Sequence, residues 1–152
     1  MRRDRLAAGF TLAETLLALG LFAGALLAIG GLTLHSRRLV AAGRAHTVAL
    51  AVARGIVEDL SAGGFEGTWR LLGLDGSAAS ARVDSRSCAW AAPWQGTLEH
   101  ALARARAEIE LVALAPAATT PLREASAVRV VVTVSWLERS RPRSLRLVMV
   151  RT

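Results

Sequence analysis

Few residues in this 152-residue chain have the types and spacing that catalysis requires. All 19 basic residues are Arg, so no Lys is present to bind nucleotide phosphates or to form a Schiff base. The chain has one cysteine, Cys88, and its three histidines lie too far apart for zinc-ligand spacing. Glu108 and Glu110 are two residues apart on an expected strand, so their side chains lie on the same face. This arrangement suits a solvent-exposed face better than acid–base catalysis. We therefore expect a protein that is not an enzyme, with no catalytic residue, metal site or cofactor.

One acid, Glu14, stands out because it lies directly before a long uncharged stretch. From Thr15 to Leu34 the chain has 20 residues without a charge. A helix of that length covers the roughly 30 Å hydrocarbon core of a membrane. A carboxylate in lipid costs about 2.5–3.5 kcal/mol on insertion scales, so an acid there is expected to have a partner and a function. We expect one transmembrane helix, with residues 10–34 as its membrane part.

A basic leader precedes this span. Residues 1–9 contain three Arg and one Asp, and positive charge beside a span stays in the cytoplasm. The rest of the chain is then outside the cytoplasmic membrane, which is the periplasm in a bacterium with two membranes. Arg37 and Arg38, just after the span, oppose this orientation weakly. We keep it because the first charges usually dominate.

Four glycines lie in the span: Gly20, Gly24, Gly30 and Gly31. Each costs about 1 kcal/mol relative to Ala in a water-exposed helix, which predicts a pliable helix. Gly20 and Gly24 are also spaced so that a second helix can approach closely in lipid. The alternative is that they have no specific role, since glycine is common in membrane helices.

After the span, we expect the helix to continue through residues 35–62. This stretch has no Pro and an apolar face, and the consecutive glycines Gly63 and Gly64 end it. Periodicity is poor from Gly64 to about Glu99, which predicts mostly loop with short strands. A short helix over residues 97–107 is compatible with the pattern, and alternation predicts a strand that starts near Glu108.

The clearest strand pattern ends the chain. Apolar residues alternate from Val128 to Trp136, a turn follows at residues 138–143, and a second run covers Leu145 to Met149. This predicts an antiparallel hairpin over residues 127–151. Its apolar face needs a cover, which the outer half of the long helix can supply. We expect an α+β fold in which the long N-terminal helix, its first half transmembrane, packs on a small antiparallel sheet within residues 63–152.

The junction between leader and span is the most specific feature. It reads Gly9-Phe10-Thr11-Leu12-Ala13-Glu14. Here the chain resembles the type IV prepilin family, which includes the pilins and the pseudopilins of type II secretion. In that family a short basic leader ends in Gly, then come Phe, a small polar residue, Leu, an aliphatic residue and Glu before about twenty apolar residues. The resemblance covers residues 8–34. Ala13 is smaller than the usual aliphatic residue, and Thr15 is polar where an aliphatic residue is common.

The resemblance implies a structural role and a set of partners. A membrane prepilin peptidase would cleave after Gly9 and methylate Phe10, and the mature helix would assemble with other pilin-like subunits through Thr11, Leu12 and Glu14. The chain would be a single-pass protein of the bacterial inner membrane with a periplasmic domain. The short domain without a terminal disulfide pair is most similar to minor subunits. These are the I-type minor pseudopilin of type II secretion and the V-type minor pilin of the type IV pilus.

Two roles remain open for Glu14. In the first, its carboxylate neutralises the new amino group of Phe10, within one subunit or on a neighbour. In the second, Thr11 is a helix N-cap and Glu14 reaches back to its backbone N–H, forming a capping box that the helix dipole also favours. The first role requires a negative charge and the second requires only a hydrogen-bond acceptor.

Parts of the sequence are also compatible with other classes of protein. The span could be a secretory signal peptide cleaved near Gly30, but that leaves Glu14 unexplained. It could be an uncleaved anchor for a periplasmic binding or enzymatic domain. Arginines near Trp136 could contact DNA in a DNA-uptake pilin, but arginines are common on exposed turns, so no nucleic-acid partner is expected. The arginines concerned are Arg139, Arg141, Arg143 and Arg146.

Overall fold

The computed structural model describes residues 11–152, so Gly9 and Phe10 lie outside the described residues. The fold is α+β: a long N-terminal helix, α1 (Leu12–Ala62), packs through its second half on a four-stranded antiparallel sheet. The chain divides into two units, residues 1–41 and 42–152, and α1 contributes to both.

In the first unit, the described residues 12–41 form helix and are exposed throughout. The hydroxyls of Thr15 and Thr33 donate to the carbonyl oxygens of Leu12 and Ile29 at 2.8 and 2.9 Å. These bonds satisfy the hydroxyl hydrogens of both threonines, as an apolar environment requires. Within residues 11–152, α1 is the one helix long and apolar enough to cross a membrane.

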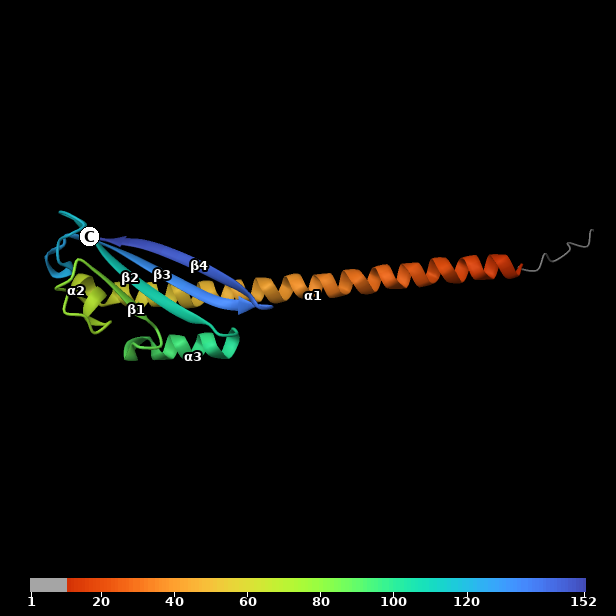
Figure 1. Cartoon of the computed structure of the whole chain (residues 1–152), viewed down its shortest axis with the longest axis horizontal. Coiled ribbons are helices and arrows are strands. Elements are labelled where there is room, and N and C mark those ends of the chain that lie inside the picture. The colour runs from red at the N-terminus through yellow and green to blue at the C-terminus, as the bar shows by residue number, and fades with distance from the viewer. Residues whose placement is uncertain (1–10) are drawn as a thin grey trace, which may run out of the picture. The chain divides into compact units, whose positions relative to one another are not determined.

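The second unit contains the sheet and two short helices, α2 (Gly64–Arg70) and α3 (Ala92–Ala101). The strands are β1 (Ser80–Asp84), β2 (Arg106–Ala115), β3 (Ala127–Glu138) and β4 (Arg141–Arg151). They lie in the order β1-β2-β3-β4, with each antiparallel to the next (Figure 1). β4 is therefore an edge strand, and Pro142 is tolerated there because an edge N–H need not pair.

One face of this sheet forms the core. Alternate residues of β2 and β3 are buried and paired, as in Ile109 with Val132 and Leu111 with Val130. The helix supplies the opposing face with small and aliphatic side chains: Ala49, Val52, Ala53, Ile56 and Leu60. The predicted hairpin and its cover by the helix are confirmed. Glu108 and Glu110 lie on the other face, where both pair with Arg82, at 2.9 and 3.4 Å.

The prediction of mostly loop between Gly64 and Glu99 is wrong for two segments. Residues 64–70 form α2, and residues 92–101 form α3, which begins and ends earlier than the helix considered over 97–107. Each is too short to show a clear helical period, and both are held by contacts with the rest of the unit. Trp69 of α2 is buried, and Trp94 of α3 packs against Gly55 of α1.

The turn between β3 and β4 is also tighter than the predicted turn over residues 138–143. Glu138 pairs with Arg141, so only Arg139 and Ser140 lie between the strands. Both have positive φ, 51° and 65°, as a two-residue turn that follows the strand twist requires. Neither is the Gly or Asn that normally marks such a turn, which is why the sequence pattern did not locate it.

Candidate functional site

The N-terminus of α1 is closed by a reciprocal pair of hydrogen bonds. The backbone N–H of Glu14 donates to Thr11 Oγ1 at 3.2 Å, and the backbone N–H of Thr11 donates to Glu14 Oε2 at 3.3 Å. Thr15 N–H donates to the Thr11 carbonyl at 3.2 Å, which begins the helical bonding. This is the capping box weighed from the sequence, and it satisfies two backbone donors at the helix end.

The capping box leaves part of the Glu14 carboxylate free. Only Oε2 takes part in it, and Glu14 is exposed in the single chain. Within residues 11–152, no ion pair involves Glu14. Leu12, the first helical residue, is 80% exposed. The amine proposed as its partner belongs to Phe10, outside the described residues. The geometry therefore places an acceptor at the helix start that can still receive a cation.

The four glycines of the span all face open space. A Cβ added at Gly20, Gly24, Gly30 or Gly31 would meet no atom within 4 Å, and α1 continues through all four. Large apolar side chains are exposed around them, including Leu17, Phe22 and Leu27. Nothing within this unit's described residues covers this surface. Its chemistry suits lipid chains and other apolar helices, and the glycines mark where a helix could come closest.

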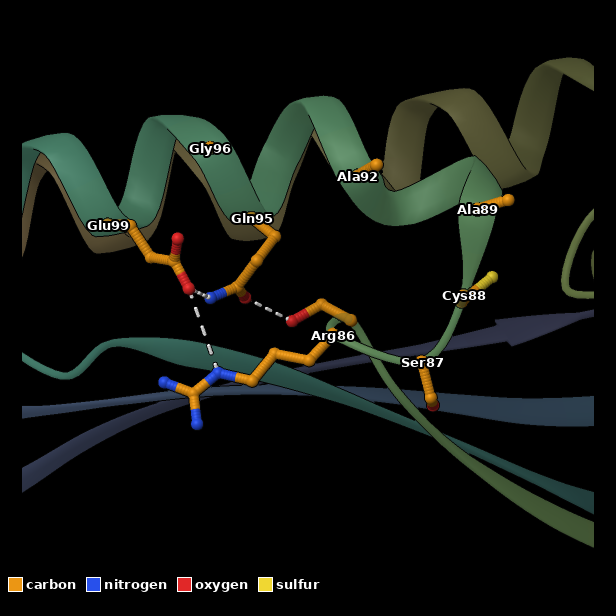
Figure 2. A pocket seen from close by; sticks show the side chains of 9 residues that line it. Arg86, Ser87, Cys88, Ala89, Ala92, Gln95, Gly96 and Glu99 are labelled. Carbon is orange, nitrogen blue, oxygen red and sulfur yellow. Dashed lines mark hydrogen bonds and ion pairs between the residues drawn. The ribbon is translucent and has the colours of Figure 1, made fainter.

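A second region with polar side chains lies between α3 and the end of β1 (Figure 2). Ser85 donates its hydroxyl to Gln95 Oε1 and accepts the backbone N–H of Ala107 at 2.9 Å. Gln95 Nε2 donates to Glu99 Oε1 at 2.6 Å and to the Ala105 carbonyl at 3.0 Å. Ser85 thus bonds an amide oxygen that cannot act as a base. The network fixes α3 on the sheet and contains no nucleophile–base pair.

The region between α3 and the end of β1 contains a hollow with a volume of about 330 Å³, and Cys88 is one of the residues that line it. Its thiol is half-buried and not in a disulfide. Glu99 Oε1 also lies 3.8 Å from Arg86 Nε, so the carboxylate that faces the hollow is shared between an amide and a guanidinium (Figure 2). With its acid engaged in this way, the hollow is an open depression beside a polar network.

Two polar features that sequence reasoning missed stabilise the other end of the second unit. Arg151, the penultimate residue, bonds backbone carbonyls at the carboxyl end of α1. In the loop after α2, the backbone N–H and then the hydroxyl of Ser77 donate to Asp75 Oδ1 at 3.0 and 2.7 Å, and they hold the pKa of Asp75 below its ordinary value. In sequence, neither residue differs from the chain's other Arg and Asp residues.

Comparison of the chain with protein-family models, with curated proteins and with solved structures finds no match. The functional argument therefore depends on the chain's own features. These are the capped start of α1, the exposed apolar helix that follows it, and the α+β unit that the same helix enters at Ala42.

Proposed function

We propose that this chain is a minor pilin-like subunit of the bacterial inner membrane, with a structural and not a catalytic function. Its prepilin form would be cleaved after Gly9 and methylated at Phe10 by a prepilin peptidase. Its span would hold it in the membrane with residues 42–152 in the periplasm, until the subunit joins a filament. The machine is a type II secretion pseudopilus or a type IV pilus, and the subunit is of the I-type or V-type.

The junction at residues 9–14 is the observation that carries this proposal. It combines a basic leader, a Gly-Phe pair and an acid at the start of an uncharged helix. The fold supports the proposal because one helix serves both as an apolar surface over residues 12–34 and as the cover of a sheet over residues 49–60. An uncleaved anchor could use Glu14 as a helix cap, but it has no use for the cleavage and methylation that the Gly9-Phe10 pair implies, whereas a filament subunit requires both.

Processing tests the proposal directly. Coexpression with a prepilin peptidase should convert the chain to a form that begins at N-methylated Phe10, and mass spectrometry of the N-terminal peptide measures this. Gly9→Val should block the conversion, because a peptidase site shaped for glycine cannot accept a branched side chain. Ala8→Val is the matched control and should be processed.

Two results would contradict the assignment. An intact Met1 terminus beside an active peptidase would indicate an uncleaved anchor. Cleavage near Gly30 that is independent of the prepilin peptidase would indicate a secretory signal peptide.

A further inference from the structure

Three exposed arginines gather at one end of the second unit. Arg139 lies in the β3–β4 turn, and Arg141 begins β4. The backbone N–H of Leu137 donates to the carbonyl of Ala103 at 2.9 Å, which brings Arg104 beside the same turn. We call Arg104, Arg139 and Arg141 the basic end. Among residues 11–152, none of the three has an ion pair or a side-chain hydrogen bond.

The acids near the basic end are already neutralised by other arginines. Glu138 pairs with Arg143 at 3.1 Å. Asp84 and Glu99 pair with Arg106 and Arg86, at 3.9 and 3.8 Å. The three arginines of the basic end therefore add an uncompensated positive charge. Such a cluster attracts anions, and its attraction weakens with salt because the arginines are exposed.

A hollow of about 350 Å³ lies at this end of the sheet. Arg86, Arg104 and Arg106 line it, together with Ser135. Guanidinium groups present paired N–H donors that match the oxygens of a phosphate group. Arg86 and Arg106 already pair with Glu99 and Asp84, so Arg104 is the unpaired guanidinium of this hollow. It can hold one phosphate, beside the remaining N–H donors of the other two arginines, within the wider attraction of the basic end.

The connection to the membrane span fixes which anionic surface is nearest. The uncharged stretch ends at Leu34, and the chain enters the second unit at Ala42. Even fully extended, this connection reaches only about 28 Å. The other end of α1 meets the end of β4, where Arg151 bonds the Leu60 carbonyl. The β3–β4 turn is at the opposite end of β4, beside the part of α1 that enters the unit (Figure 1).

Charge is distributed along the second unit in a way that agrees with this placement. The end far from the entry carries exposed acids without an ion pair among residues 11–152, namely Glu58, Asp59 and Asp75. Arg151, which bonds uncharged acceptors there, offsets one of these three charges. The basic end, near the entry, has the opposite sign. A negatively charged membrane would therefore attract one end of the unit and repel the other.

We propose that the basic end binds the anionic phospholipid headgroups of the membrane that holds α1, with one lipid phosphate in the hollow lined by Arg86, Arg104 and Arg106. The tether keeps the headgroups at high local concentration, so modest attraction is enough for contact. This binding goes beyond the proposed role in a filament and requires only that α1 lies in a membrane. It would hold the periplasmic unit near the surface before assembly.

The test uses the full chain in lipid nanodiscs, without partner subunits. A nitroxide on Ser144→Cys, in a Cys88→Ser background, reports proximity by broadening the phosphorus NMR signal of the lipids. Broadening should be at least about threefold greater in discs that contain phosphatidylglycerol than in pure phosphatidylcholine discs. It should fall to the neutral-disc level in about 1 M NaCl, where the Debye length is near 3 Å. The salt titration leaves the three arginines unsubstituted, so its result does not depend on whether a variant of the basic end folds.

Substitution separates the basic end from general charge. The triple variant Arg104→Gln, Arg139→Gln and Arg141→Gln should lose the extra broadening, with an unchanged circular dichroism spectrum. The control triple Arg54→Gln, Arg70→Gln and Arg123→Gln removes the same charge elsewhere and should keep it. Equal broadening in neutral and anionic discs, or equal loss in both triples, would overturn the proposal.

Two further arms separate other anions from lipid. If inorganic phosphate binds with the same dependence on the three arginines while broadening in anionic discs stays at the neutral level, the hollow is a site for a free phosphate and the lipid proposal is wrong. If labelled duplex DNA binds with the same dependence on the three arginines while broadening stays at the neutral level, the partner is a nucleic acid. Retained broadening in the presence of both supports lipid. None of these outcomes depends on cleavage at Gly9, so they are independent of the test of the proposed function.

Discussion

The guanidinium of Arg151 lies at the carboxyl end of α1, with Nη1 2.6 Å from the carbonyl oxygen of Leu60. The same group donates to the carbonyls of Ser61 and Gly64 and to the hydroxyl of Thr68, at 3.1, 2.7 and 3.0 Å. The last carbonyls of a helix have no partner within the helix. One side chain at the end of β4 therefore satisfies acceptors from both α1 and α2.

Replacing Arg151 with Gln should destabilise the second unit by about 1.5–3 kcal/mol, since hydrogen bonds from a charged donor are lost and the acceptors lose their partner. All four tryptophans lie in this unit, so their fluorescence during urea unfolding of the full chain in nanodiscs measures its stability. Arg146→Gln is the control, because Arg146 is exposed and has no side-chain partner among residues 11–152. This substitution should change the free energy of unfolding by no more than about 0.5 kcal/mol. Equal effects of the two substitutions would refute the bridging role.

Gly55 allows α3 to approach α1. A Cβ at Gly55 would lie 2.8 Å from Cζ3 of Trp94, closer than carbon atoms can pack. Glycine to alanine in a helix normally gains up to about 1 kcal/mol, but overpacking of this kind costs about 1–3 kcal/mol. Gly55→Ala should therefore destabilise the unit.

The control for Gly55 is Gly96→Ala in α3, where an added Cβ would meet nothing within 4 Å. That substitution should leave stability unchanged or raise it. Combining Gly55→Ala with Trp94→Leu should recover part of the loss, because the smaller side chain removes the clash. If Gly55→Ala and Gly96→Ala stabilise alike, the close contact does not constrain the packing of these helices.

Val132 tests the orientation of the hairpin. It is fully buried on the core face of β3, whereas Val148 of the neighbouring strand is 51% exposed on the other face. Val132→Asp should cost more than about 3 kcal/mol, because an unpaired carboxylate would be buried. Val148→Asp should be tolerated. We expect Val132→Asp, but not Val148→Asp, to abolish the near-ultraviolet circular dichroism of the tryptophans. The opposite result would mean that the strand register is shifted by one residue.

Elements with a strong period were predictable from the sequence, and elements held by tertiary contacts were not. The hairpin was predicted because alternation continues through Val128, Val130 and Val132, and α1 because its apolar stretch is long. By contrast, α2 and α3 span 7 and 10 residues, and their positions depend on Trp69 and Trp94 reaching the core. No local sequence pattern indicates which residues a tryptophan will contact in the folded chain.

The same contrast holds for the polar sites. The capping box was predictable because Thr11 and Glu14 are three residues apart and bond each other. Arg151 bonds residues about ninety positions away, so nothing near it in sequence indicates its role. The sequence pattern drew attention to glycines in the span and at the end of the long helix, whereas the packing of residues 42–152 also requires Gly55 and Gly76, each of which lies against a tryptophan.

The two roles of Glu14 respond differently to two substitutions. Glu14→Gln keeps a hydrogen-bond acceptor that can bond Thr11 N–H, but it removes the charge. Thr11→Val removes the hydroxyl that accepts the Glu14 N–H, but it keeps the charge. Loss of an N-cap side chain costs about 0.5–2 kcal/mol of helix stability. An amine left without its carboxylate in low dielectric costs more, because nothing there replaces water.

If charge pairing with the Phe10 amine is required, Glu14→Gln should be inserted and cleaved normally but should crosslink poorly to partner subunits, while Thr11→Val assembles well. If capping is the whole role, Thr11→Val should be the weaker assembler and Glu14→Gln should match wild type, because the glutamine amide oxygen still accepts the Thr11 N–H. The measurement is the crosslinking yield to partner subunits at matched abundance and matched N-terminal processing. We expect the first pattern, because an acid at the start of an uncharged helix costs free energy that a neutral cap would avoid. The second pattern would remove charge neutralisation from the assembly proposal and leave Glu14 as a helix cap.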